Sequence, residues 1–385
     1  MRFRSMFAPR RAVMSPVEKL FQVNWGLILL VAAVACIGFA MQFSAAGGSA
    51  DPWASRQMAR FAVGLGMLLF VAMVDLRVWF RFAYAIYAVA MVLLVAVEVA
   101  GRIGMGAQRW LDLGPLQLQP SELMKIGLVL VLARWFHGLS TEEVGRPLNL
   151  VWPTLLALVP AALVAKQPDL GSALLIIAVT GVMYFLAGVR LWMFGLVVGA
   201  GMALVPVAWR FLRDYQRQRV LTFLSPENDP LGSGYHIIQS KIALGSGGIW
   251  GKGFLQGTQS HLQFLPEKQT DFIFTMFAEE FGIVGSIALI ALYALILVYV
   301  TMIALQSKSQ FGRHVAGGVM ATFWVYAFIN MAMVMGLLPV VGEPLPFVSF
   351  GGTALMALLI SFGLVINVYV HRDVWVGRHG IGDGG

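Results

Sequence analysis

Ten long apolar runs divide this chain, and they constrain its fold more than any other feature. A helix needs about 20 mostly apolar residues to cross the hydrocarbon core of a bilayer. Runs of about this length lie at residues 24–43, 57–74, 82–100, 120–137, 150–165, 170–188, 191–209, 272–304, 313–338 and 348–371. The sequence therefore predicts an all-α polytopic membrane protein with about ten transmembrane helices.

The distribution of Lys and Arg predicts the orientation of these spans. An even number of spans places both termini on one side, and basic residues in short loops favour the cytoplasm. Fourteen Lys and Arg lie on the side that holds the termini, against five in the short loops of the other side. We expect a cytoplasmic segment at residues 1–23, a transmembrane domain at 24–371 with a long extracytoplasmic loop at 210–271 between its seventh and eighth spans, and a cytoplasmic tail at 372–385.

Charged residues are scarce, which makes each one near a span informative. They form 12% of the chain, against about 25% in ordinary soluble domains. The net charge of +8 comes from basic residues at the ends of spans, so it indicates membrane orientation and no nucleic-acid partner. Cys36 is the single cysteine, so no disulfide can form within the chain. Ionisable groups inside a span are costly and usually face a cavity or a partner.

The start of the eighth run carries an acidic group of candidates. Asp271, Thr275, Glu279 and Gly282 recur at helical spacing on one face, and Glu280 adjoins them. Asp271 has two interpretations. It can cap the orphan N–H groups at a helix N-terminus, or it can belong to a site at the outer mouth of the span.

The fourth run begins with Pro120, Glu122 and Lys125. A proline start, an acid in the first turn and an i, i+3 ion pair are typical of an ordinary helix start. Lys125 nevertheless lies inside a hydrophobic run and needs a carboxylate nearby. Our hypothesis is that Glu279 or Glu280 supplies it.

The outward loops carry further candidate groups. Arg109 precedes the fourth run, where a guanidinium suits bidentate phosphate binding. Asp169 begins the sixth run, where a helix cap is the commoner role. Lys252, Glu267 and Lys268 lie in the long loop among glycines and prolines. This composition suits a bulky polar ligand that carries phosphate.

The rest of the long loop limits the kinds of binding site that it can form. Residues 235–244 predict a short amphipathic helix on the membrane surface. The glycines that follow do not form an ATP-type phosphate loop, because Gly253 follows Lys252 where that motif requires Ser or Thr. The histidines show no metal-ligand spacing; His236 and His261, for example, share the loop but lie 25 residues apart.

Seven motifs, taken together, resemble those of one known family. They are Gln108-Arg109-Trp110, Gln119 to Lys125, Lys166 to Gly171, Gly232 to Tyr235, Gly253 to Ser260, Leu265 to Phe274, and Pro346 to Gly352. The family is SEDS (shape, elongation, division and sporulation), the membrane peptidoglycan glycosyltransferases. Gly336 to Val341 and the closing Val370-His371-Arg372 look more like the elongation branch, RodA, than the division branch, FtsW. Gln269 stands where many members have histidine, so no role is carried over to it.

The resemblance implies that the chain polymerises lipid II into β-1,4 glycan strands at the outer face of the bacterial inner membrane, with Asp271 as the catalytic carboxylate. The departing pyrophosphate needs fixed cations or a metal ion. Candidates for holding substrate are Arg109, Lys268, Lys252, the run Arg213, Arg217 and Arg219, and also Glu267, Glu122, Lys125 and Asp169. Thr275, Glu279 and Glu280 are expected to form a supporting network. No cofactor is certain, and a divalent cation could be held mainly by pyrophosphate oxygens.

The resemblance also implies partners and leaves alternatives open. The partners are a class B penicillin-binding protein of the PBP2 type and the elongation complex of MreB, MreC and MreD. The alternatives are a lipid-linked oligosaccharide flippase or other transporter, and the division-specific FtsW-type polymerase. A transporter needs polar residues near the bilayer midplane that both faces can reach, whereas these candidates gather at the outer ends of spans four, six and eight.

Overall fold

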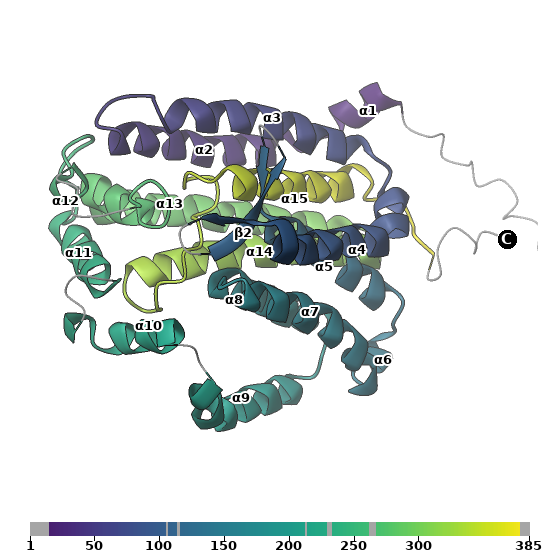
Figure 1. The fold of residues 1–385 in the computed structure, drawn as a ribbon. Coiled ribbons are helices and arrows are strands. Elements are labelled where there is room, and N and C mark those ends of the chain that lie inside the picture. Colours follow the sequence, from purple (N-terminus) through teal and green to yellow (C-terminus); the bar gives the residue numbers. More distant parts are fainter. Residues whose placement is uncertain are drawn as a thin grey trace, which may run out of the picture.

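The computed structural model describes residues 15–104, 107–113, 116–211, 214–228, 233–261 and 267–377. Figure 1 shows a bundle of long helices that lie side by side. The long helices are α2 (Trp25–Ala45), α3 (Ala54–Met73), α4 (Leu76–Ala100), α5 (Pro120–His137), α7 (Leu148–Lys166), α8 (Leu170–Ala187), α9 (Leu191–Phe211), α13 (Ile273–Gln306), α14 (Gln310–Val334) and α15 (Gly352–Val370). Each overlaps one predicted apolar run, and the predicted all-α polytopic fold is confirmed.

Eight of these helices are long and apolar enough to cross a membrane by length and composition alone. The other two are α5, which carries Glu122, Lys125 and Arg134, and α9, whose apolar part is the shorter stretch Leu191–Val207. Glu122 and Lys125 are buried within the protein. The cost of placing these two charges in a span is therefore met by protein partners and not by lipid.

Short elements occupy the connections between the long helices. They are α1 (Pro16–Phe21), α6 (Thr141–Val144), α10 (Asp214–Leu224), the 3₁₀ helix η1 (Pro226–Asn228), α11 (Ser233–Ser246), α12 (Thr258–His261), and the strands β1 (Arg102–Gly104), β2 (Ala107–Leu113) and β3 (Leu116–Leu118). The strands form one antiparallel sheet in the order β1-β2-β3. The helix predicted at residues 235–244 is confirmed as α11, whereas α10 and the sheet were not predicted.

Helices α14 and α15 form the centre of the bundle, and most of their side chains are buried. Helix α9 lies at the periphery in Figure 1 and exposes most of its apolar side chains, as a lipid-facing helix does. Glycines allow the closest approaches. A Cβ at Gly363 of α15 would lie 2.8 Å from the carbonyl oxygen of Leu68, and one at Gly38 of α2 would lie 2.7 Å from that of Phe347.

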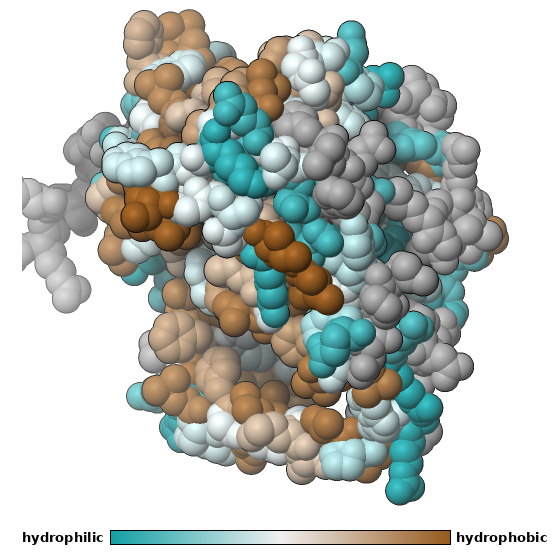
Figure 2. All heavy atoms as spheres, turned by 90° about the vertical axis from the view of Figure 1, so that its left-hand side faces the viewer, coloured by the Kyte–Doolittle hydropathy of each residue, from teal (hydrophilic) through white to brown (hydrophobic). Residues whose placement is uncertain are grey.

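The two ends of the bundle differ. We call the end that holds residues 46–53, 267–272 and 336–351 the site end. Helix α1 and the end of α15 lie at the opposite end (Figure 1). Both described chain ends therefore share one end, as an even number of spans predicts. Figure 2 looks onto the site end, where hydrophilic and hydrophobic side chains are interspersed.

Helix α13 is broken near its start, at Gly282, whose φ of 66° and ψ of −162° are not helical. The glycine-rich loop 247–253 lies against this break, and the N–H of Lys252 donates to the carbonyl of Glu279 over 3.0 Å. A Cβ at Gly251 would lie 2.1 Å from a carbonyl oxygen of α13, so only glycine permits this approach. The break leaves a short half-helix at the site end.

Candidate active site

Asp271 lies in the turn that precedes α13 and is half-buried. The N-cap residue of α13 is Phe272, whose side chain makes no cap hydrogen bond. A Cβ at Gly342 would lie 3.3 Å from Oδ2 of Asp271, so the carboxylate stands against the loop between α14 and α15. Asp271 is therefore not the N-cap residue of α13, and its role at the site stays a prediction.

The backbone around Asp271 is fixed on three sides. Three consecutive carbonyl groups of the turn accept hydrogen bonds: Gln269 O from Phe350 N (2.8 Å), Thr270 O from Ser349 Oγ (2.6 Å) and Asp271 O from Asn330 Nδ2 (2.9 Å). The loop that supplies two of these donors is itself held by glutamines of α2 and α3. Gln42 donates to the carbonyl of Val348 and Gln57 to that of Ser349, each over 3.0 Å.

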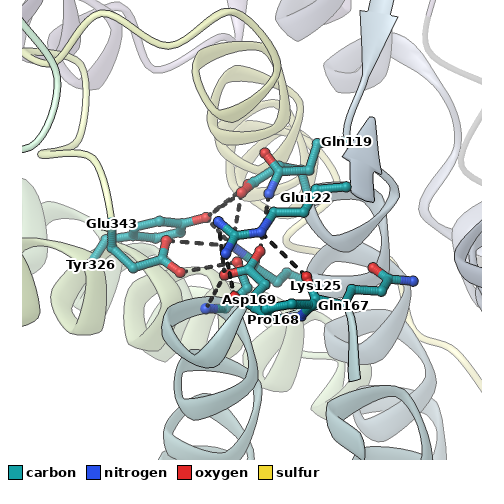
Figure 3. A network of polar contacts seen from close by, with 10 residues as sticks. Gln119, Glu122, Lys125, Gln167, Pro168, Asp169, Tyr326 and Glu343 are labelled. Carbon is teal, nitrogen blue, oxygen red and sulfur yellow. Dashed lines mark hydrogen bonds and ion pairs between the residues drawn. The ribbon is translucent and has the colours of Figure 1, made fainter. Parts of the chain in front are cut away.

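Figure 3 shows a buried charged cluster. It includes Glu343, whose backbone carbonyl accepts from the same Asn330 nitrogen as that of Asp271. Lys125 Nζ lies 2.8 Å from Oε1 of Glu122 and 3.8 Å from Oε2 of Glu343, and all three side chains are almost completely buried. Tyr326 donates to both oxygens of Glu122 and also accepts a hydrogen bond from Lys125. The predicted i, i+3 pair is confirmed. The hypothesis that Glu279 or Glu280 pairs with Lys125 is wrong, because the second carboxylate is Glu343.

Glu343 lies on the loop between α14 and α15, and Ser172 of α8 donates to its Oε1 over 3.0 Å. Burial raises the pKa of Glu343 to about 8, although Lys125 acts in the opposite direction. Lys125 lies between Glu122 and Glu343, so its buried charge has carboxyl partners inside the protein.

Arg109, on β2, is tied to the start of α8. It donates to the carbonyl groups of Pro168 and Gln167 and lies 4.0 Å from Oδ1 of Asp169. Asp169 caps α8 by accepting from the N–H of Ser172 over 3.3 Å, so the predicted cap is confirmed. Its other oxygen accepts from Gln119 (Figure 3). Arg109 is thus partly engaged by the protein, with 29% of its side chain exposed.

Glu279 anchors the glycine-rich loop and takes no part in the Lys125 cluster. Its fully buried carboxylate accepts from Lys252 Nζ over 2.7 Å, from Thr258 Oγ1 over 3.2 Å and from the N–H of Gln259 over 3.1 Å. Lys252, predicted to hold pyrophosphate, has its ammonium group engaged by this carboxylate.

The other predicted members of the helix face have separate partners. Glu280 accepts from Ser44 of α2 over 2.5 Å. Thr275 hydrogen-bonds Ser240 of α11 over 2.8 Å. The predicted polar network on the start of α13 is therefore present, but it joins α13 to α2, to α11 and to the glycine-rich loop, and these contacts do not converge on one point.

The remaining candidates lie on the turn itself or in the long loop. Glu267 accepts from Gln269 and Thr270 within the turn, each over 3.2 Å. Lys268 is half-buried, and burial lowers its pKa. Arg217 donates to carbonyl groups at the end of α9. Arg213 and the side chain of Arg219 lie outside the described residues. Among those described, no three His, Cys, Asp or Glu side chains are grouped to hold a metal ion.

Comparison with known proteins assigns the family. The sequence model of the FtsW, RodA and SpoVE cell cycle proteins matches residues 19–374. The peptidoglycan glycosyltransferase MrdB of Escherichia coli K12 is 45% identical over 353 residues, which cover 90% of this chain and 94% of MrdB. This chain belongs to the FtsW/RodA/SpoVE family.

Other SEDS proteins show a similar relation. A probable peptidoglycan glycosyltransferase FtsW of Trichlorobacter lovleyi is 36% identical over 91% of this chain and 94% of its own length. The rod shape-determining protein RodA of Thermus thermophilus matches with a TM-score of 0.69 and 31% identity over 91% of this chain and 97% of its own. A chain from a peptidoglycan synthase complex that coordinates polymerization and crosslinking matches with a TM-score of 0.78 and 34% identity over 91% of this chain and 98% of its own.

In this SEDS chain, three buried residues of the charged cluster and the Asp271 turn escaped the sequence analysis: Glu343, Tyr326 and Asn330. Tyr326 and Asn330 are four residues apart on α14, so a polar stripe at helical spacing inside an apolar run was the available signal for them. Glu343 stands in an irregular loop, where spacing says nothing about which way a side chain points.

Proposed function

We propose that this chain is a peptidoglycan glycosyltransferase that polymerises lipid II, with Asp271 as its catalytic carboxylate. One observation carries the assignment: the turn at 269–271 is held by three hydrogen bonds from neighbouring elements, and Asp271 is not the N-cap residue of α13. A fixed backbone with a half-exposed acid suits a group that must be positioned against a substrate.

The proposed chemistry follows from the substrate. A sugar hydroxyl is a poor nucleophile, and a positioned carboxylate can take its proton as the new bond forms. The acceptor is the 4-hydroxyl of GlcNAc on the incoming lipid II, and the leaving group is the pyrophosphate of the growing chain. An α-linked donor and a β-1,4 product make the step a single inverting displacement.

Cations must stabilise the departing pyrophosphate. Lys268 is three residues before Asp271 on the same turn, so it becomes the first candidate. Arg109 keeps part of its guanidinium exposed and stays a candidate, whereas the engagement of Lys252 by Glu279 makes it a weaker one. A divalent cation stays a prediction that treatment with EDTA tests.

The elongation branch and the inner membrane complete the proposal. The identity to MrdB and the likeness to a rod shape-determining RodA support the elongation branch. A class B penicillin-binding protein is the proposed partner, supported by the likeness to a chain from a complex that both polymerises and crosslinks. MreB, MreC and MreD are further proposed partners, and the termini are proposed to be cytoplasmic.

One experiment distinguishes the proposed polymerase from the transporter alternative. The purified chain, with and without its penicillin-binding partner, is incubated in detergent with labelled lipid II, with or without EDTA. Detergent provides no compartments, so the proposal expects glycan chains on a gel. Lipid II movement across vesicle membranes without any glycan chains in detergent would support the transporter instead.

A further inference from the structure

Asn330 lies four residues before the end of α14, at the point where two loops of the site end meet. Its side chain is fully buried. One of the two loops is the turn that carries Asp271, and the other is the segment between α14 and α15 that carries Glu343.

The amide of Asn330 joins these two loops through a single nitrogen. Nδ2 donates to the carbonyl of Asp271 over 2.9 Å and to the carbonyl of Glu343 over 2.8 Å. Both N–H groups of the amide are therefore used. A carboxylate has no N–H donor to offer and a hydroxyl has one O–H, so only a side-chain amide makes this pair of bonds at this size.

The oxygen of the same side chain makes no such bond within the described part of the chain. Among the described residues, Oδ1 of Asn330 has no hydrogen-bond partner, although it is buried. A buried acceptor without a partner costs free energy. The asparagine therefore accepts a penalty on one atom in order to place two donors with the other.

The bond to Glu343 also connects Asp271 to the charged cluster. The side chain of Glu343 accepts from Ser172 over 3.0 Å and lies 3.8 Å from Lys125. The backbone of Asp271 is thus linked, through one amide, to a loop that is fastened to α5 and α8. These contacts fix the position of the Asp271 backbone relative to the helices that surround it.

We propose that Asn330 is a positioning residue that sets the location of the Asp271 carboxylate. The inference rests on the proposed function of Asp271. Without the amide, the turn keeps the bonds from Phe350 and Ser349 but loses the one at Asp271 itself. The acid then moves relative to the sugar hydroxyl, and a displacement of about 1 Å is enough to slow a reaction by roughly 100-fold.

The chain offers a matched control in Asn367 of α15. This asparagine is also fully buried and also donates to backbone carbonyl groups, those of Val71 and Ala72 at 3.0 and 3.1 Å. Its oxygen likewise has no partner among the described residues. It lies near the end of α15 that is away from the site end, so it shares the chemistry of Asn330 but not its location.

The test compares Asn330→Ala, Asn330→Asp and Asn367→Ala in the lipid II assay, with rates divided by the amount of folded protein. We expect Asn330→Ala to lower kcat by roughly 10- to 100-fold, with KM for lipid II within roughly 3-fold of wild type. Asn367→Ala is expected to lower Tm but to leave kcat unchanged.

Asn330→Asp preserves the size of the side chain and gives a pH readout. Ionised, it repels both carbonyl groups; protonated, it can donate to one. Its kcat relative to wild type should therefore rise as pH falls. An Asn330→Ala enzyme with the kcat of Asn367→Ala, or an Asn330→Asp ratio that does not change with pH, would overturn the positioning role. Asp271→Asn is run in parallel: full polymerisation by that variant would reject the proposed function itself.

Discussion

Glu279 has its ion-pair partner in Lys252, and Lys125 has its own in Glu122. The two pairs involve different elements. Glu279, Glu122 and Lys125 are buried, whereas 27% of the Lys252 side chain is exposed. Removing one member leaves a buried charge uncompensated, which is strongly destabilising in proteins. The pairing therefore predicts which substitutions are coupled in stability.

Double-mutant cycles test this pairing. Lys252→Met combined with Glu279→Gln should show a coupling energy of about 0.5–3 kcal/mol, because each change removes the same interaction. Lys125→Met combined with Glu279→Leu should be additive within about 0.5 kcal/mol. The free energy of unfolding of each variant, measured in detergent, gives the coupling energy of both cycles. Coupling in the second cycle and none in the first would contradict the arrangement described.

Single residues also show what a sequence can and cannot predict. Glu122 and Lys125 are three apart on one helix, so their contact follows from helical geometry alone. Glu343 is 218 positions from Lys125, and the pairing depends on how a loop between two central helices folds back. The spacing of residues along the sequence does not show how this loop folds back. For this reason Glu279 or Glu280 was wrongly predicted to be the second partner of Lys125.

Among the elements, the broken start of α13 depends most on particular residues. Gly282 has a positive φ, and a Cβ there would lie 2.4 Å from the N atom of Gly251. Gly251 also has a positive φ and approaches the carbonyl of Glu280. The two glycines let the loop enter the break, and neither position has room for a side chain.

Alanine substitutions test the break. A left-handed backbone costs a non-glycine residue about 1–2 kcal/mol before any clash is counted, so Gly282→Ala and Gly251→Ala should lower the Tm and the yield of monodisperse protein. Gly245→Ala is the control, since it lies on α11 and its Cβ would meet no atom within 4 Å. Equal stability of all three variants would show that the loop does not depend on these glycines.

The sequence predicted the membrane-spanning helices better than it predicted the short elements between them. Long apolar runs of about 20 residues identify spans without help from tertiary structure, and all ten overlap helices. The small sheet was missed although its signal was present: Leu111 and Leu113 alternate with polar residues, as do Leu116 and Leu118 across Gly114-Pro115. Within an otherwise helical chain, these short runs were treated as loop.

At the scale of the whole molecule, the charge asymmetry predicts which end faces the cytoplasm. Cys36 is the single cysteine, so Cys36→Ser gives a background in which cysteines can be placed one at a time. Ser49 lies at the site end, and Gln306 lies at the opposite end; both are exposed.

Cysteine labelling tests this orientation. Ser49→Cys should react with a membrane-impermeant maleimide in intact spheroplasts, whereas Gln306→Cys should react only after the membrane is opened. The reverse labelling pattern would place the site end in the cytoplasm and would contradict the proposed reaction at the outer face.

The proposed site lies at one end of the molecule, where α5, α8, α13 and α15 begin. The apolar spans set the depth of these helix N-termini in the membrane. The few charged side chains there provide the candidate groups for the proposed reaction. Asp271 is the residue on which the proposed reaction depends, because its turn is held by hydrogen bonds from α14 and from the loop between α14 and α15.

The most direct measurement is the rate of glycan synthesis from lipid II by purified Asp271→Asn, beside wild type and the control Asp51→Asn, which changes an exposed acid on another loop of the site end. The account predicts that Asp271→Asn folds with an unchanged Tm but loses at least about 100-fold in rate, while Asp51→Asn retains the wild-type rate. Glycan chains formed by Asp271→Asn at the wild-type rate would contradict the account.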